Sequence, residues 1–191
     1  MVHIRIEDLE KYALENHVPI MLKDGIDFLT DYIKKNGIKS VLEIGTAIGY
    51  SSIKMAFCGV SVTTIERDKN MYDKALNNVN LFNMNDKIHL IFADALDVDL
   101  KGKYDLIFID AAKSQYIKFF EKFQKNLNTN GVIITDNLSF HGLVNDCSNC
   151  SRNTKQLVKK IKKYIEFLKT NANFETTFLE IGDGISISKR V

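Results

Sequence analysis

Oxygen-bearing side chains stand at the ends of two apolar runs in the second half of the chain. Asp110 ends the run 104–110, Asp136 ends the run 131–136, and Asn137 follows directly. Two carboxylates and one amide oxygen suit a hard divalent cation such as Mg²⁺. Each acid could instead cap a following helix, which fits Asp110 better than Asp136 because a loop follows Asp136. The spacing therefore favours a metal site at Asp110, Asp136 and Asn137.

A lysine accompanies these ligands. Lys113 stands three residues beyond Asp110. A cation bound nearby would disfavour the ammonium form, so that Lys113 could accept a proton as a general base. A solvated lysine at the start of a helix is an equally good interpretation of the same residue. Lys113 and Asp110 are thus the candidate catalytic residues.

A glycine-containing turn forms a second candidate site in the first half of the chain. The apolar run that starts at Val41 breaks at Gly45, where a tight turn needs a residue without a Cβ atom. A helical pattern begins at Tyr50. Backbone N–H groups at such a strand–turn–helix unit favour the polar or anionic groups of a nucleotide.

Two acids indicate which nucleotide this turn suits. The glycines, Gly45 and Gly49, form Gly-x-x-x-Gly and not the Gly-x-Gly-x-x-Gly pattern of dinucleotide sites. Glu43 would repel a pyrophosphate but attract the ammonium group of S-adenosylmethionine. Glu66 lies 21 residues past Gly45, where an acid can accept hydrogen bonds from ribose hydroxyls. Together the acids favour S-adenosylmethionine over a nicotinamide cofactor and over a purely structural turn.

Apolar periodicity predicts the elements that must position these residues. Strands alternate with helices five times before a terminal hairpin, which predicts a doubly wound α/β fold with a mostly parallel seven-stranded sheet and an antiparallel C-terminal edge. Ligands of such sheets bind beyond the carboxyl ends of the strands. The acids predicted at those ends are Glu66, Asp94, Asp110 and Asp136. The predicted helices are 7–15, 20–35, 50–58, 69–82 with Asp68 as N-cap, 114–127 and 153–170, and the predicted strands are 40–45, 61–66, 88–92, 104–110, 131–136, 174–179 and 185–188.

Composition bounds the class of protein. The chain has 191 residues of which 45% are hydrophobic, which is enough for a single globular domain over 1–191, including two N-terminal helices within 1–36. No apolar run approaches the roughly 20 residues of a membrane helix. Residues 1–5 lack the apolar core of a signal peptide. We therefore expect a cytoplasmic protein without a membrane partner.

Three cysteines are an odd number, which fits a reducing compartment. Cys147 and Cys150 have the C-x-x-C spacing, but a zinc site would need two more ligands and only His141 is near in sequence. A redox pair usually opens a helix. We therefore expect Cys147 and Cys150 to be two ordinary loop thiols.

Basic charge is concentrated in one predicted helix. Residues 152–169 hold seven basic residues and one acid, a local charge of +6 in a chain whose net charge is +2. Leu157, Ile161, Ile165 and Leu168 would form the buried stripe, which leaves the lysines outward. Such a face could follow the phosphates of a nucleic acid, or it could simply be solvated.

These motifs, taken in order, resemble the cation-dependent O-methyltransferases, the family that includes catechol and caffeoyl-CoA O-methyltransferases. Within the family the chain looks most like the bacterial tRNA 5-hydroxyuridine methyltransferases. Two features depart from the pattern: the family's leading helix would begin before residue 1, and the loop 145–152 has no counterpart. The resemblance is carried by His17–Met21, Leu42–Ser51, Thr64–Glu66, Ala93–Ala95, Phe108–Tyr116, Gly131–Asn137 and Gly182–Gly184.

The resemblance implies a class I, Rossmann-like methyltransferase that forms homodimers. It implies Lys113 as the base and the same three metal ligands. The cofactor residues that it implies are Met21, Ser51, Glu66, Asp94, Ala95 and Asp110, to which the turn itself adds Glu43 and Gly45. The expected substrate is 5-hydroxyuridine in tRNA, with a small molecule bearing vicinal oxygens, such as a catechol, as the alternative. A non-catalytic RNA-binding module is a further alternative, which the complete set of candidate ligands disfavours.

Overall fold

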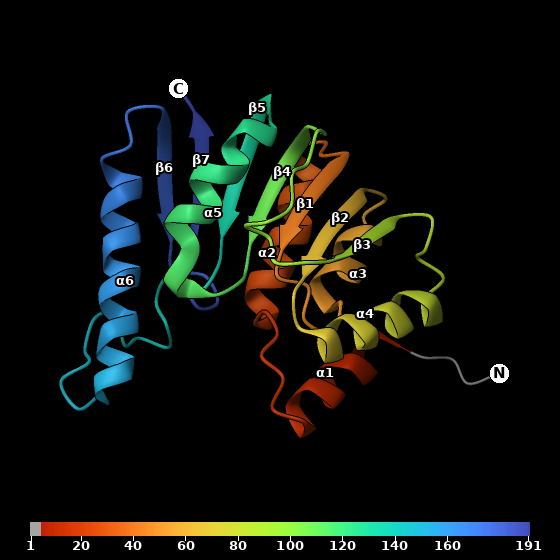
Figure 1. Cartoon of the computed structure of the whole chain (residues 1–191), viewed down its shortest axis with the longest axis horizontal. Coiled ribbons are helices and arrows are strands. Elements are labelled where there is room, and N and C mark those ends of the chain that lie inside the picture. The colour runs from red at the N-terminus through yellow and green to blue at the C-terminus, as the bar shows by residue number, and fades with distance from the viewer. Residues whose placement is uncertain (1–4) are drawn as a thin grey trace.

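The computed structural model describes residues 5–191, and its central feature is a seven-stranded sheet (Figure 1). The strand order is β3-β2-β1-β4-β5-β7-β6. Strands β1 to β5 pair in parallel, and β7 pairs antiparallel with both β5 and β6. The predicted α/β class with an antiparallel C-terminal edge is confirmed. The strands are β1 (Ser40–Ile44), β2 (Ser61–Glu66), β3 (Ile88–Phe92), β4 (Tyr104–Ile109), β5 (Leu127–Thr135), β6 (Phe174–Leu179) and β7 (Ile185–Arg190).

Helices cover both faces of the sheet because its central strands are apolar on both faces. On β4, Leu106 and Phe108 pack into one core with the buried residues of the helices that precede β3. Ile107 and Ile109 point the other way, into a core shared with the two helices that follow β4. The helices on the first face are α1 (Ile6–Glu15), α2 (Lys23–Lys35), α3 (Tyr50–Ala56) and α4 (Lys69–Leu81), and those on the second are α5 (Tyr116–Phe123) and α6 (Arg152–Lys169).

The predicted helix over 114–127 is wrong at both ends. Lys113–Gln115 and Gln124–Asn126 are 3₁₀ turns, and Leu127 already belongs to β5. The buried side chain of Asn126 donates hydrogen bonds to the carbonyls of Leu100 and Gly102 at 2.7 and 2.8 Å. These bonds tie the chain to the strand-connecting loop, so the helix ends before Leu127 turns into the sheet.

The helix predicted over 20–35 begins three residues later, at Lys23. Leu22 is extended, with φ −62° and ψ 150°, and stands as the non-helical residue that precedes the first turn of α2. The extended segment turns the buried Met21 inward. The strand predicted over 131–136 begins four residues earlier, at Leu127, and ends at Thr135, and the other predicted bounds agree with the structure to within two residues.

The buried face of α6 differs from the predicted stripe. Ile161 and Leu168 are buried as predicted, but Val158 and Tyr164 take the remaining buried places. Leu157 and Ile165 are only partly buried. Tyr164 is drawn inward because its hydroxyl shares a 2.8 Å hydrogen bond with Thr135. The helix is rotated slightly, and its lysines all remain exposed.

No helix in the described part of the chain is long and apolar enough to cross a membrane. Residues 1–4, which carry most of the N-terminal stretch behind the signal-peptide expectation, lie outside the described residues.

Candidate active site

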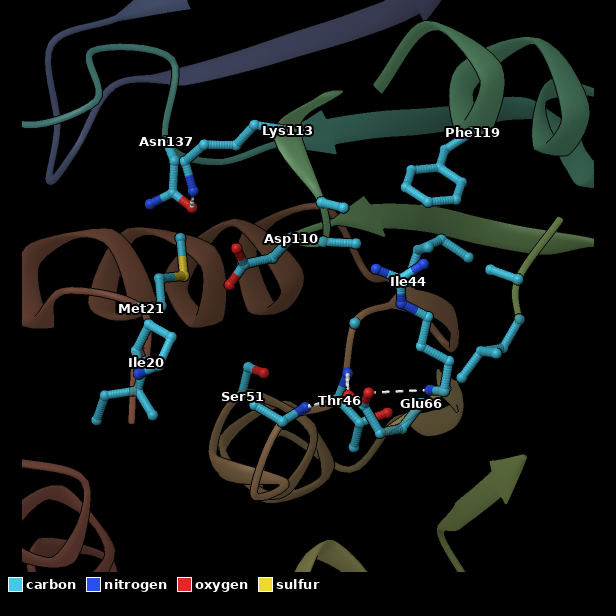
Figure 2. A pocket seen from close by; sticks show the side chains of 18 of the residues that line it. Ile20, Met21, Ile44, Thr46, Ser51, Glu66, Asp110, Lys113, Phe119 and Asn137 are labelled. Carbon is cyan, nitrogen blue, oxygen red and sulfur yellow. Dashed lines mark hydrogen bonds between the residues drawn. The ribbon is translucent and has the colours of Figure 1, made fainter. Parts of the chain in front are cut away.

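A cavity of ≈ 450 Å³ opens at the carboxyl ends of the central strands. Figure 2 shows Ser51 and Glu66 on one side of it, Lys113 and Asn137 across from them, and Asp110 between the two groups. The cavity thus joins the glycine turn and the predicted metal cluster in one site. The predicted residues that line it are Met21, Gly45, Ser51, Glu66, Asp94, Ala95, Asp110, Lys113 and Asn137.

The turn after β1 depends on the glycine at position 45. Gly45 has φ +98°, and a Cβ atom there would lie 2.1 Å from the backbone oxygen of Asp110. The backbone N–H of Asp110 in turn donates to the carbonyl of Ile44 at 3.0 Å. The glycine therefore lets the turn lie directly against the end of β4, so the two halves of the site are in contact.

Glu66 holds the same turn from the end of β2. One carboxylate oxygen accepts from the backbone N–H groups of Thr46 and Ala47 at 3.2 and 2.8 Å. The other accepts from the N–H groups of Arg67 and Asp68 at 2.9 and 2.8 Å. Ala47 has φ 48°, a left-handed backbone that these bonds help to hold. Glu66 therefore braces the turn while it lines the cavity.

Glu43 departs from its predicted role as a cofactor contact. It is fully buried and is not among the residues that line the cavity. Its carboxylate accepts hydrogen bonds from the hydroxyls of Ser51, Ser52 and Thr64. Burial raises the pKa of Glu43 to about 7, although the three hydroxyls oppose the shift. The side chain faces back into the protein because these hydroxyls satisfy it, so it positions Ser51 and does not reach the cavity.

Asp94 follows β3 and faces the cavity beside Ala95. One carboxylate oxygen accepts from the backbone N–H of Leu96 at 2.9 Å, and the other pairs with Arg67 at 3.3 Å. The acid is thus held in place by its own turn and by a side chain from the end of β2.

The predicted metal ligands lie together because their strands are neighbours. Ile109 and Thr135 are paired in the register of β4 and β5, so Asp110 and Asp136 come next on adjacent strands. The backbone N–H of Asp136 donates to the carbonyl of Ile109 at 3.2 Å. Asp110 and Asn137 line the cavity, whereas Asp136 is 1% exposed and lies behind them.

The charges of this cluster are poorly compensated. Burial, followed by the neighbouring carboxylate of Asp110, raises the pKa of Asp136 to about 7. Burial also raises the pKa of Asp110, and nearby Lys113 partly offsets the rise. One carboxylate oxygen of Asp136, Oδ1, is buried and has no hydrogen-bond partner. A cation would satisfy this oxygen and neutralise the pair.

The donor set fits a hard divalent ion only if the amide of Asn137 takes part. No three His, Cys, Asp or Glu residues within 5–191 are grouped to hold a metal. The amide oxygen of Asn137 supplies the third donor beside Asp110 and Asp136, and it now accepts a 2.9 Å hydrogen bond from the Lys113 ammonium. Two carboxylates and an amide oxygen fit such an ion, and one carboxylate oxygen, Oδ1 of Asp136, has no other partner among the described residues.

The sequence patterns missed several residues of the site. His141 and Phe119 line the cavity, and Thr46 and Ala47 supply the N–H groups that Glu66 accepts. Asp183 reaches the cluster from the β6–β7 hairpin, where Gly182-Asp183-Gly184 had indicated only a turn. An acid flanked by two glycines at a hairpin turn is the one sequence signal that could have marked it.

The prediction of two free loop thiols is wrong. Cys147 and Cys150 form a disulfide. The backbone N–H of Cys150 donates to the carbonyl of Cys147, and this turn brings the two Cα atoms within 5.1 Å. Cys58 is the free cysteine among the described residues.

Known proteins resemble this chain in both sequence and fold. A family model described as O-methyltransferase matches residues 2–191. The chain belongs to the O-methyltransferase family. A Staphylococcus aureus structure described as a candidate caffeoyl-CoA O-methyltransferase is 40% identical to this O-methyltransferase, with a TM-score of 0.93 over 98% of this chain and 93% of that chain.

Two further relatives bear on the cofactor and the family type. The O-methyltransferase from Bacillus cereus, solved in complex with SAH, is 26% identical, with a TM-score of 0.82 over 97% of this chain and 90% of that chain. The caffeoyl-CoA O-methyltransferase of Populus kitakamiensis is 26% identical over 98% of this chain and 85% of its own length. This chain is thus an S-adenosylmethionine-dependent O-methyltransferase of the caffeoyl-CoA O-methyltransferase type.

Proposed function

We propose that this O-methyltransferase acts on a substrate with two vicinal oxygens and requires a divalent cation such as Mg²⁺. Asp110, Asp136 and Asn137 would hold the cation. The observation that carries the proposal is the unpartnered buried oxygen of Asp136, which lies behind Asp110 and Asn137 in the cavity that the glycine turn also lines. When bound there, a divalent cation supplies positive charge that favours the oxyanion form of a substrate hydroxyl.

Different residues of the chain then bind the cofactor and accept the proton. The turn at Gly45, with Ser51, Glu66 and Asp94, binds the cofactor on one side of the cavity. Lys113, across the cavity, accepts the proton of the substrate hydroxyl. The oxygen attacks the methyl carbon in line with the sulfur, the carbon–sulfur bond breaks, and its electron pair stays on the sulfur as S-adenosylhomocysteine is formed.

A small substrate of the catechol or caffeoyl-CoA kind is the first candidate. The names of relatives such as the Populus kitakamiensis caffeoyl-CoA O-methyltransferase support it. A catechol offers two adjacent oxygens, which matches the proposed donor set.

The second candidate is 5-hydroxyuridine in tRNA, which methylation would convert to 5-methoxyuridine. Its ring hydroxyl and neighbouring carbonyl are also vicinal oxygens. The observation that favours it is the basic face of α6, which lies at the edge of the molecule beside β6 (Figure 1). Its exposed basic residues are Arg152, Lys155, Lys159, Lys160, Lys162, Lys163 and Lys169.

The variant Asp136→Ala tests the cation requirement. We expect methyl transfer to be lost at saturating Mg²⁺ while the affinity for S-adenosylmethionine, measured by calorimetry, is unchanged. Asp99→Ala is the control, because the Asp99 side chain is 76% exposed and lies in a surface ion pair. Full activity of Asp136→Ala, or of the wild-type enzyme in a chelator, would refute the proposed role of the cation.

A charge reversal on α6 separates the two substrates. Lys159→Glu, Lys160→Glu and Lys163→Glu together leave the cavity untouched. If tRNA is the substrate, the wild-type enzyme methylates tRNA taken from cells that lack it, and the triple variant does so more weakly and with a shallower salt dependence. If the substrate is a small catechol, the variant and the wild-type enzyme turn it over equally, and neither methylates the tRNA.

We also propose a homodimer for the enzyme, on the strength of the family resemblance. Sedimentation of the purified protein tests it: a dimer mass supports the proposal, and a monomer at micromolar concentration overturns it.

A further inference from the structure

The hairpin between β6 and β7 carries an acid whose burial its sequence does not explain. Asp183 stands between Gly182 and Gly184, which have φ +57° and +84°. Aspartate side chains are rarely fully buried unless they are paired, yet Asp183 is only 3% exposed. An added Cβ at Gly184 would lie 2.7 Å from the backbone nitrogen of Ser139, so the hairpin presses closely on the loop after β5.

Asp183 joins that loop by three contacts. Its Oδ2 accepts from the side-chain Nδ2 of Asn137 at 3.4 Å, and its Oδ1 accepts from the backbone N–H of His141. Its backbone carbonyl accepts from the N–H of Ser139 at 2.7 Å. Asp183 thus holds both a proposed metal ligand and a residue of the cavity rim.

These contacts fix which way the amide of Asn137 points. Its NH₂ group donates to two carboxylates, Asp136 at 3.2 Å and Asp183 at 3.4 Å. Its oxygen accepts from the Lys113 ammonium at 2.9 Å. A carboxylate only accepts hydrogen bonds and an ammonium only donates them, so the reversed amide would lose all three contacts.

The loop that Asp183 holds is strained. Asn137, Phe140 and His141 have φ values of 63°, 50° and 56°. Asparagine tolerates this left-handed backbone, but it is unfavourable for a bulky residue such as Phe140. Such a backbone persists only when its surroundings hold it. The bonds from Asp183 to His141 and Ser139 supply part of that hold.

We propose that Asp183 is a positioning residue that turns the amide oxygen of Asn137, rather than its NH₂ group, toward Lys113 and the bound cation, and that anchors His141 at the cavity rim. The inference rests on the proposed cation requirement. Removing a residue that does not touch the metal but orients one of its ligands typically lowers metal affinity by about 10–100-fold.

The test first replaces the Asp183 carboxylate by an amide, and a second variant then restores a hydrogen bond between positions 183 and 137. Asp183→Asn keeps the shape of the side chain and can still accept from the backbone of His141. It also presents an NH₂ group to the NH₂ group of Asn137, which should drive the Asn137 amide to reverse. We expect Mn²⁺ affinity, measured by electron paramagnetic resonance, to fall by about 10–100-fold, while affinity for S-adenosylmethionine is unchanged.

The double variant Asp183→Asn/Asn137→Asp exchanges the two groups and keeps the total charge. The new amide donates to the new carboxylate, and an oxygen again faces the cavity whichever way that carboxylate turns. We expect the double variant to recover most of the Mn²⁺ affinity lost in Asp183→Asn. A purely structural role for Asp183 would give no such rescue.

The side-chain amide signal of Asn137 in a ¹H–¹⁵N spectrum, assigned by its loss in Asn137→Asp, reports the orientation without metal. We expect it to shift and to exchange faster with water in Asp183→Asn. An unchanged signal, or Mn²⁺ affinity equal to that of the wild-type enzyme, overturns the inference. If the wild-type enzyme binds no Mn²⁺, the cation requirement fails, and the amide signal still decides whether Asp183 orients Asn137.

Discussion

Replacing the buried acid behind the glycine turn should remove a measurable pH dependence of stability. Glu43 is fully buried, and burial raises its pKa from 4.5 to about 7. Between these values the folded protein binds a proton that the unfolded chain has released, so stability falls as the pH rises through this window. At roughly 1.4 kcal/mol per pKa unit, ionised Glu43 should lower the free energy of unfolding by about 2–3 kcal/mol at pH 8 relative to pH 5.

The comparison variant is Glu43→Gln, because an amide at this position cannot ionise. The hydroxyls of Ser51, Ser52 and Thr64 can rotate to donate or accept, so the amide can be accommodated. Urea unfolding of both proteins at pH 5, 6, 7 and 8 gives the difference in free energy of unfolding. Groups remote from Glu43 titrate alike in the two proteins, and their contributions cancel, whereas the nearby Asp110 carboxylate interacts with Glu43 and its response is part of the measured difference.

We expect the wild-type protein to lose stability relative to Glu43→Gln by about 2–3 kcal/mol over this range, with most of the loss between pH 5 and 7. Profiles that stay parallel within about 0.5 kcal/mol would refute the reasoning. If the wild-type protein gains stability relative to the variant as the pH rises, the hydrogen bonds from the hydroxyls, and not burial, determine the pKa of Glu43.

Two further substitutions test the local geometry. Gly45→Ala should destabilise the protein by more than about 2 kcal/mol in thermal unfolding and abolish cofactor binding, because its Cβ would meet the Asp110 carbonyl at 2.1 Å in a left-handed backbone. Tyr50→Phe removes a 2.6 Å hydrogen bond to Glu10 and should cost about 1–2 kcal/mol, with faster amide exchange in α1; unchanged exchange would show that this bond does not hold α1.

Local patterns in the sequence predicted most of the framework. The apolar runs located β2 and β3 to the residue, and Asp68 caps α4 through the backbone N–H groups of Asn70 and Met71, as its position predicted. Glycine at position 45 marked the turn because its left-handed backbone is a local requirement. These features depend on residues that are near one another in the chain.

The predictions that were wrong concern features that depend on contacts between residues of different elements. The rotation of α6 depends on a hydrogen bond between Tyr164 and Thr135 that no helical periodicity contains. Glu43 turns away from the cavity because Ser51, Ser52 and Thr64 satisfy it, and these residues meet it only in the folded sheet.

Asp110 and Asp136, two of the proposed metal ligands, lie on adjacent strand ends as expected, because those strand ends were predictable. The role of Asp183 was not, because the hairpin that carries it packs onto a loop 40 or more residues earlier in the chain.

The most direct test of the account is a crystal structure of the enzyme grown with S-adenosylhomocysteine and Mn²⁺, with anomalous scattering recorded for the metal. We predict one anomalous peak at about 2.0–2.3 Å from oxygens of Asp110, Asp136 and Asn137, with the cofactor product against the turn at Gly45. A cavity that holds the product but shows no peak at these oxygens, or a peak bound elsewhere, would contradict the proposed chemistry.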